Sequence, residues 1–298
     1  MSYEGHSAAE NPGTPTPTAA PDLVSAEEPT LYPESTINAG PESAQPLQHS
    51  QFPAAPDVGA GDATQSRYPF WNYRDLLLFF GLGFPAILIG QLLVLGFATL
   101  FHLDHGPKTF LLVPSQFLAY LMLFAVLWGV LHFQYGRPFW PSLGWVDYRL
   151  SAGVPLLCGL TVAYGISFLG AWMHLENIET PMQELLTDRR NAVLLAIFGT
   201  TLGPLCEELA FRGFMQPLLT RSFGTVPGIV LTALPFGLLH LAQNAFSWRH
   251  VLLIGLAGAA FGAMRQITGS TRAATWMHAA YNGAFFASFL AAGGKAGH

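Results

Sequence analysis

The stretch LLLFFGLGFPAILIGQLLVLGFATLF occupies residues 76–101 and contains no charged side chain. An α-helix needs about 20 consecutive apolar residues to cross the hydrocarbon core of a bilayer, and this stretch exceeds that length. It is therefore predicted to be a membrane-spanning helix. The whole composition agrees, because 51% of the 298 residues are hydrophobic and only 10% are charged, against about 25% charged in an ordinary soluble domain.

Six further apolar segments follow the first one along the chain. Together the segments predict an all-α fold, a polytopic membrane bundle of about seven (six to eight) transmembrane helices. The further segments are 110–133, 152–174, 191–219, 226–246, 251–267 and 273–292. A short interfacial helix is expected at 178–186, between the third and fourth segments.

Residues 1–66 differ from the rest of the chain in composition. They hold nine of the eighteen acidic residues and no Lys or Arg, and they are rich in Pro, Ala, Ser, Thr and Gly. A segment that cannot bury enough apolar surface to offset its ordering entropy stays disordered. The predicted organisation is therefore a disordered acidic leader at 1–66 and a transmembrane domain at 67–298. Gly59–Asp62 matches the short GxGD motif of aspartyl intramembrane proteases, but its place in the leader argues against a function.

The positions of the basic residues predict the orientation and the membrane. With the N-terminus in the cytoplasm, seven basic residues fall on the cytoplasmic side of the predicted spans and five on the other side, as the positive-inside rule favours. The use of eleven Arg against two Lys hints at a GC-rich genome. We therefore expect an integral protein of a bacterial inner (cytoplasmic) membrane, with a cytoplasmic N-terminus.

Small residues in the predicted spans have structural explanations. Cys158 and Cys206 are too few for a disulfide framework or a zinc ribbon, and they are expected to pack as small apolar side chains. Gly255, Gly258 and Gly262 form a small-residue face on the segment 251–267, which predicts close helix packing.

Ionisable residues inside apolar segments are the strongest functional signal in this chain. The run Glu207-Glu208-Leu-Ala-Phe-Arg212 lies in the fourth segment, and His240 and His278 lie in the fifth and seventh. Such groups are costly at bilayer depth unless they face a protected polar cavity, so they are read as a functional site. They indicate a hydrolytic site built inside the membrane.

Helical spacing assigns separate roles to the two glutamates. Glu208 and Arg212 are four residues apart, which places them on one helix face and predicts an ion pair. Glu207 lies about 100° around the helix from Glu208. Its carboxylate is therefore the one expected to hold a water molecule as a general base.

The same spacing groups the polar residues of the last segments. His240 follows Phe236 by four residues, and Asn282 follows His278 by four. Asn and His side chains can donate hydrogen bonds to a developing oxyanion, so these groups complete a set suited to amide hydrolysis. Asn244 either extends this polar patch or caps the helix end.

The three motifs resemble those of a known family of membrane peptidases. Glu207-Glu208-x-x-x-Arg212, Phe236-x-x-x-His240 and His278-x-x-x-Asn282 stand in order, as in the CAAX-protease and bacteriocin-processing (Abi, or CPBP) family. That family includes type II CAAX prenyl endopeptidases and lysostaphin-resistance proteins. The resemblance covers about residues 190–292, whereas residues 1–150 carry no family signal.

The resemblance implies an all-helical intramembrane peptidase. Glu207 and His240 would activate water, and His278 and Asn282 would stabilise the oxyanion. Glu208 and Arg212 would hold the architecture, with Phe236 in support. The implied partners are the lipid bilayer and a peptide or membrane-protein substrate, which need not be prenylated, and no nucleic acid is expected.

The cofactor stays open at this point. Glu207, His240 and His278 form a His₂Glu set that could hold zinc with an open fourth position, although no HExxH pair is present. A metal-free glutamate mechanism is slightly preferred. The family has been described as metalloproteases, and zinc remains a candidate.

Two other classes of function compete with the endopeptidase hypothesis. A non-catalytic membrane scaffold, such as a bacteriocin-immunity-type protein, could carry the same polar groups as a binding pocket or a relic. A small transporter could also use intramembrane acids and histidines, but it would predict an inverted repeat, and no repeat relates the two halves of the chain.

Overall fold

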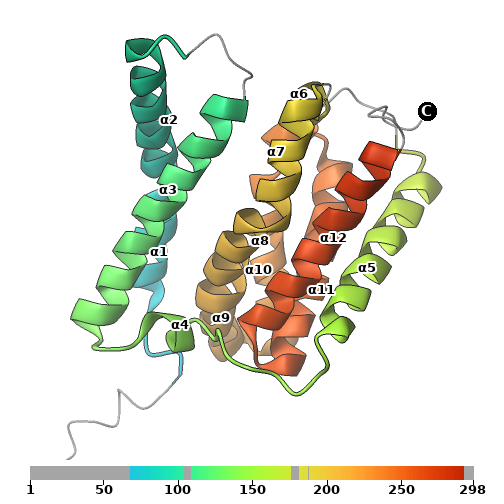
Figure 1. The fold of residues 1–298 in the computed structure, drawn as a ribbon. Helices are drawn as coiled ribbons and strands as arrows, with labels where there is room; N and C mark the ends of the chain where they lie inside the picture. The colour runs from blue at the N-terminus through green and yellow to red at the C-terminus, as the bar shows by residue number, and fades with distance from the viewer. Residues whose placement is uncertain (1–67, 104–108, 176–180, 187, 292–298) are drawn as a thin grey trace, which may run out of the picture. The chain divides into compact units, whose positions relative to one another are not determined.

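The computed structural model describes residues 68–103, 109–175, 181–186 and 188–291 (Figure 1). The predicted leader at 1–66, with its GxGD motif, lies outside these residues. Every regular element in the described part is helical, which confirms the all-α prediction.

Helices cover all seven predicted apolar segments. In chain order the elements are α1 (Tyr73–Gly81), α2 (Gly83–Leu100), α3 (Thr109–Gly129), the π-helix η1 (Val130–Gln134), α4 (Phe139–Ser142), α5 (Gly153–Trp172), α6 (Pro181–Leu186), α7 (Arg189–Thr200), α8 (Leu202–Glu208), the π-helix η2 (Leu209–Met215), α9 (Gln216–Phe223), α10 (Thr225–Leu239), the 3₁₀-helix η3 (Ala242–Asn244), α11 (Trp248–Thr268) and α12 (Thr271–Ala291). The described part of the predicted interfacial helix is α6.

Five helical stretches in the described part are long and apolar enough to cross a membrane. They are Tyr73–Leu100, Thr109–Gln134, Gly153–Trp172, Arg189–Phe223 and Trp248–Thr268. α10 is apolar but has only 15 residues, and it ends at Leu239 rather than at 246 as predicted. The backbone leaves α-helical geometry at His240, with φ −90° and ψ 2°, and Ala245 and Phe246 have positive φ angles of 50° and 60°, outside the α-helical region. The chain is thus an integral membrane protein of several spanning helices.

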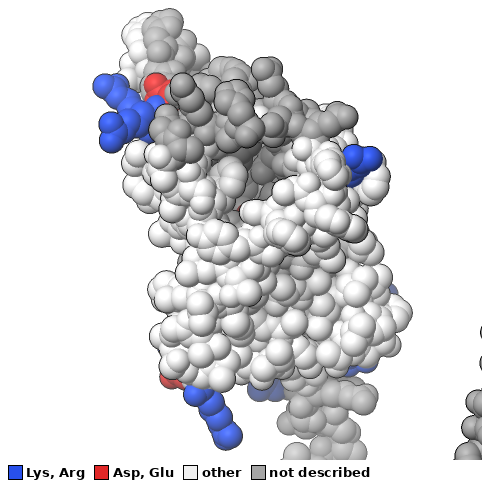
Figure 2. All heavy atoms as spheres, turned by 90° about the vertical axis from the view of Figure 1, so that its right-hand side faces the viewer, with Lys and Arg blue, Asp and Glu red and all other residues white. Residues whose placement is uncertain are grey.

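The outward surface of the helices suits a lipid environment. Leu77, Phe84 and Phe168 each expose about three quarters of their surface, at 75%, 76% and 74%. On the face shown in Figure 2, charged side chains lie toward the two ends, and the surface between them is uncharged. An uncharged band between two charged ends fits the hydrocarbon core of a bilayer between its headgroup layers.

The helices pack in neighbouring pairs around one aromatic core. α2 lies beside α3, α5 beside α12, and α10 between α9 and α11 (Figure 1). Buried rings of Phe211, Phe214, Phe236 and Phe261 hold this core together. Trp71, just before α1, is also fully buried, and its indole Nε1 donates to the Phe214 carbonyl at 3.0 Å.

α10 and α11 approach each other closely, as the small-residue face predicted. A Cβ atom at Gly258 would lie 2.7 Å from Cδ1 of Phe236, and one at Gly262 would lie 3.1 Å from Cγ2 of Ile229, both in α10. A Cβ atom at Gly255 would make only an ordinary contact, at 3.6 Å from the Ala233 carbonyl. Two of the three predicted glycines therefore serve close packing.

The fourth predicted segment is not one continuous α-helix. α7 ends at Thr200, the φ of −125° and ψ of −88° at Thr201 leave the helical region, and α8 begins at Leu202. Pro204 lies in the first turn of α8, and proline cannot donate the backbone hydrogen bond that would continue α7. The break and the π-helix η2 reshape the stretch that carries the glutamates.

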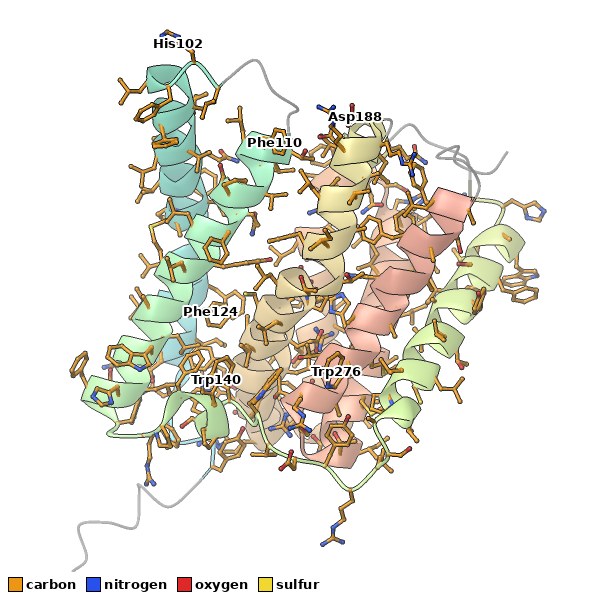
Figure 3. All side chains as sticks on the ribbon, viewed as in Figure 1. His102, Phe110, Phe124, Trp140, Asp188 and Trp276 are labelled. Carbon is orange, nitrogen blue, oxygen red and sulfur yellow. The ribbon has the colours of Figure 1, made fainter. Side chains whose placement is uncertain are left out.

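The two ends of the bundle can be followed by labelled side chains. Phe110 and Asp188, at the starts of α3 and α7, lie at one end, and Trp140 of α4 lies at the other (Figure 3). α9 also ends on the Trp140 side (Figure 1).

Candidate active site

The glutamates lie where an α-helix gives way to a π-helix. α8 ends at Glu208, and all seven residues of η2, from Leu209 to Met215, are buried. A π-helical turn contains an extra residue, and such turns are frequent at functional sites. The sequence pattern predicted only a regular helix here.

The ion pair that the spacing predicts is present and fully buried. Nη1 of Arg212 donates to Oε1 of Glu208 at 2.9 Å, and both side chains are 0% exposed. Nη2 of Arg212 donates to the Gly258 carbonyl at 2.6 Å, and the guanidinium lies 4.4 Å from the centroid of the Phe236 ring. Buried charges need partners of this quality to offset their desolvation.

His278 contacts the same glutamate oxygen as the arginine. Its Nδ1 lies 2.9 Å from Oε1 of Glu208, and its ring stacks on Phe261 with centroids 4.5 Å apart and planes 18° apart. A carboxylate oxygen accepts, so Nδ1 carries the proton and the neutral ring presents a lone pair at Nε2. Glu208 therefore orients His278 as well as neutralising Arg212.

Asn282 holds two partners at once. Its Nδ2 donates to the Gly199 carbonyl at 2.7 Å and lies 3.3 Å from Nε2 of His278. The last carbonyls of a helix lack intrahelical donors, and Gly199 is the penultimate residue of α7. Asn282 thus caps the broken end of α7 while it faces the imidazole.

Two threonine hydroxyls donate to other carbonyls near the end of α7. The hydroxyl of Thr200 donates to the Ala196 carbonyl at 2.6 Å, and that of Thr201 donates to the Ile197 carbonyl at 2.5 Å. Asn282 is the partner that reaches this helix end from another helix, α12. The cap therefore ties α12 to α7 beside the imidazole of His278.

His240 follows directly after α10 and is held by its own helix. Its Nδ1 lies 2.9 Å from the Phe236 carbonyl, which can only accept, so Nδ1 carries the proton and Nε2 is left with its lone pair. The His240 ring lies 5.1 Å from that of Phe236, and the His278 ring lies 5.8 Å from Phe236 on another side. The amide of Asn244 donates to the His240 carbonyl at 2.8 Å. Of the two predicted roles of Asn244, this contact fits the cap of the helix end.

Both glutamates keep a buried Oε2 without a hydrogen-bond partner, but among the described residues only Glu208 has its other oxygen in an ion pair, with Arg212. Glu207 is half-buried. The Arg212 guanidinium lies close enough to Glu207 to interact with it electrostatically. An unpaired buried carboxylate oxygen is costly and calls for an explanation, such as a bound water molecule or a catalytic role.

Tyr120 is a neighbour of Glu207 that the sequence did not reveal. It belongs to α3, and its phenol lies close enough to the Glu207 carboxylate for the two to interact. Its ring stacks on Phe198 of α7, with centroids 6.2 Å and planes 5° apart. One signal was available, because Gln116 and Tyr120 are polar residues four apart in an apolar segment.

The structure thus gathers the predicted residues into one neighbourhood. Contacts link the six side chains of Glu208, Arg212, Phe236, His240, His278 and Asn282. Glu207 adjoins this set through the chain and through Arg212. The catalytic roles of these residues stay predictions.

The predicted zinc ligands do not fit a metal site in this arrangement. Within the described ranges, no three His, Cys, Asp or Glu side chains are grouped so that they could hold one metal ion. His278 has Glu208 at one ring nitrogen and Asn282 at the other.

The two cysteines are free and half-buried. Cys158 packs against the aromatic core, in agreement with a packing role.

A comparison with known families agrees with the three motifs. Residues 189–284 match the family model described as type II CAAX prenyl endopeptidase Rce1-like. No curated protein and no solved structure matches the chain. The matched residues include all three motifs, whereas Tyr120 lies outside them. Residues 189–284 of this chain are therefore an Rce1-like domain of the CAAX-protease (CPBP) family.

Proposed function

We propose that the chain is an intramembrane endopeptidase that cuts a peptide or membrane-protein substrate with water activated by Glu207 and His240. One observation carries this proposal: Glu207 has a buried, unpaired Oε2 and forms no ion pair with a described residue, whereas Oε1 of Glu208 is held by both Arg212 and His278. A base must keep a free oxygen for its water, and Glu207 has one. The family is a protease family, which supports the same class of reaction.

In the proposed reaction, a water molecule lies between Glu207 and Nε2 of His240. The Nδ1 proton of His240 is held by the Phe236 carbonyl, so Nε2 can accept a hydrogen bond from the water and orient it. Glu207 takes a proton as the water oxygen attacks the scissile carbonyl carbon. The protonated Glu207 then returns that proton to the leaving nitrogen as the C–N bond breaks.

The negative charge that develops on the carbonyl oxygen needs a donor. His278 and Asn282 are the proposed donors, but in this arrangement the amide of Asn282 points to Gly199 and His278. Nε2 of His278 lies on the ring edge opposite Glu208, which holds Nδ1 at 2.9 Å, and a proton on Nε2 would make that nitrogen a donor to the oxyanion. The amide of Asn282 would then turn from Nε2 toward the oxyanion.

We further propose that catalysis is metal-free, because the donor set does not converge on one point. The test is the cleavage rate after exhaustive chelation, with metal content measured on the same sample. An unchanged rate in metal-free protein supports the glutamate mechanism. A rate lost on chelation and restored by zinc would contradict it.

The proposed setting is a bacterial inner membrane with the N-terminus in the cytoplasm. The substrate is proposed to be a peptide or membrane protein that need not be prenylated, and the bilayer is the other partner. The mild excess of basic residues on the cytoplasmic side of the spans supports this orientation.

Glu207→Gln is the decisive variant for the activity. Its amide is nearly isosteric with the carboxylate but cannot act as a base, so cleavage is expected to fall by a factor of about 10² to 10⁴. The readout is comparative peptidomics of membranes from cells with wild-type or variant protein, followed by a purified assay on the substrate found. The matched control is Asp147→Asn, which makes the same kind of change at an exposed acid.

The scaffold alternative makes the opposite prediction. If the protein only binds a partner, its phenotype survives the double variant Glu207→Ala, His240→Ala. Wild-type cleavage rates in Glu207→Gln would overturn the endopeptidase proposal.

A further inference from the structure

A polar cavity lies beside the candidate active site and shares Arg212 with it. It has a volume of about 390 Å³. Its walls come from the segment before α1, from η2 and α9, from the start of α10 and from the end of α11. The lining residues are Tyr68, Pro69, Arg212, Gln216, Pro217, Thr220, Arg221, Thr225, Arg265, Gln266 and Gly269.

The cavity carries positive charge without negative charge. None of its described lining residues is acidic. The charge of Arg212 is balanced by Glu208, but Arg221 donates to the Pro69 carbonyl, a neutral group. Arg265 also contacts neutral oxygens, those of Thr271 at 3.1 Å and Tyr68 at 3.2 Å. Two arginines with neutral partners at the wall of one cavity favour an anionic ligand.

A buried amide adds a second requirement on the ligand. Gln216 is 1% exposed, and its Nε2 donates to the Gly262 carbonyl at 2.9 Å. Its Oε1 is buried with no hydrogen-bond partner. An unpaired buried acceptor is costly, so the ligand that fits best also brings an O–H or N–H donor.

Exposed apolar side chains flank the charged wall. Phe223, Val226 and Ile267 are 55%, 70% and 79% exposed, and each lies within two residues of a lining residue. Large apolar side chains at a helix end, next to arginines, are what a lipid meets with its acyl chains and its headgroup together. A free anion would gain nothing from this apolar rim.

We propose that this cavity binds the headgroup of an anionic phospholipid, a phosphodiester that carries a hydroxyl group, such as glycerol. The phosphate lies against Arg221 and Arg265, whose planar guanidinium groups match phosphate oxygens. The headgroup hydroxyl donates to Oε1 of Gln216, and the acyl chains lie along Phe223, Val226 and Ile267. Arg212 lines the cavity and also holds Glu208, so the bound lipid adjoins the candidate active site.

The test is lipid binding by the full chain in nanodiscs. The bulk lipid is phosphatidylcholine, phosphatidylglycerol is titrated in, and bound lipid is counted by native mass spectrometry. Arg221→Gln is expected to weaken phosphatidylglycerol binding about tenfold, the usual scale for a charged hydrogen bond. Arg272→Gln is the matched control, because Arg272 pairs with Asp147 and does not line the cavity. The melting temperatures of both variants are measured first, and binding is compared only if the two temperatures are equal.

Two ligand comparisons test the chemistry further. Phosphatidylmethanol has the same phosphodiester without a headgroup hydroxyl, and it is expected to bind more weakly than phosphatidylglycerol. Water-soluble glycerol phosphate is expected to compete poorly, because it lacks the acyl chains.

Several results would overturn the proposal. Equal binding of phosphatidylcholine and phosphatidylglycerol would show that the cavity does not select an anionic lipid. Equal effects of Arg221→Gln and Arg272→Gln would show that Arg221 does not bind the phosphate. If phosphatidylmethanol binds as tightly as phosphatidylglycerol, the headgroup hydroxyl does not donate to Gln216. Glycerol phosphate that displaces the lipid at equal concentration would show that the ligand is a free phosphate. None of these readouts depends on peptidase activity.

Discussion

Nδ1 of His278 and Nη1 of Arg212 both lie 2.9 Å from a single atom, Oε1 of Glu208. The three groups come from α8, η2 and α12, so one carboxylate joins parts of the chain 70 residues apart. Oε1 of this glutamate is occupied by both contacts, and its Oε2 is buried without a hydrogen-bond partner. The shared oxygen ties the Arg212 guanidinium and the His278 imidazole together next to Glu207.

Glu208→Gln is expected to destabilise the protein more than any surface change. It leaves the Arg212 charge fully buried without an anion, which costs about 3–5 kcal/mol when one partner of a buried pair is removed. The measurement is the unfolding free energy in detergent micelles. Asp147→Asn breaks an ion pair of the opposite kind, with side chains 40% and 88% exposed, and should cost less than about 1 kcal/mol. If both variants lose the same unfolding free energy, the buried ion pair contributes no more to stability than the exposed one.

Gly258→Ala is expected to damage the site through packing alone. The added Cβ atom would lie 2.7 Å from Phe236 and 3.1 Å from Nη2 of Arg212, two groups that α10 and η2 hold in place. Overpacking of this kind costs about 1–3 kcal/mol. Gly255→Ala is the matched control, because it lies one turn earlier on α11 and meets only an ordinary contact. Melting temperatures of the two variants, measured side by side, decide the point, and equal values would contradict it.

Asn282→Ala is expected to change both stability and rate. It leaves the Gly199 carbonyl without its donor, at a cost of about 1–3 kcal/mol, and it removes a proposed oxyanion donor, which typically lowers kcat by about 10² to 10³.

Thr201→Val separates the two roles. It removes a hydrogen bond at the same helix break but touches no proposed catalytic group, so only stability should fall. If Asn282→Ala keeps wild-type kcat, the side chain is a helix cap and not a catalytic donor.

The sequence was sufficient to predict the all-α fold class, and contacts in the structure link six of the residues predicted for the site. Apolar runs long enough to cross a bilayer report directly on helices, because the backbone must satisfy its own hydrogen bonds in lipid. The i,i+4 spacing of Glu208 and Arg212 likewise predicted their ion pair, since both partners lie on one short stretch of helix.

Long-range contacts could not be predicted in the same way. The bond from His278 to Glu208 and the cap from Asn282 to Gly199 join separate helices, and spacing along one helix carries no information about them. The break at Thr201 and the π-helix η2 were also missed, because an apolar pattern does not distinguish one helical geometry from another. α10 ends at Leu239 because the backbone leaves α-helical geometry at His240, with φ −90° and ψ 2°, and the apolar pattern that continues past this residue gives no sign of the break.

Tyr120→Phe tests whether the catalytic neighbourhood extends beyond the Rce1-like domain. The phenol interacts with Glu207, whereas the ring stacks on Phe198, so the phenylalanine keeps the packing and loses only the hydroxyl. If the hydroxyl positions Glu207 or its water, kcat should fall about tenfold, in the range of one lost hydrogen bond, with little change in KM or melting temperature. Tyr164→Phe makes the same substitution on the exposed surface of α5 and should leave all three unchanged. A variant with wild-type kcat would limit the catalytic groups to the family segment, while a loss confined to kcat would place α3 in the active site.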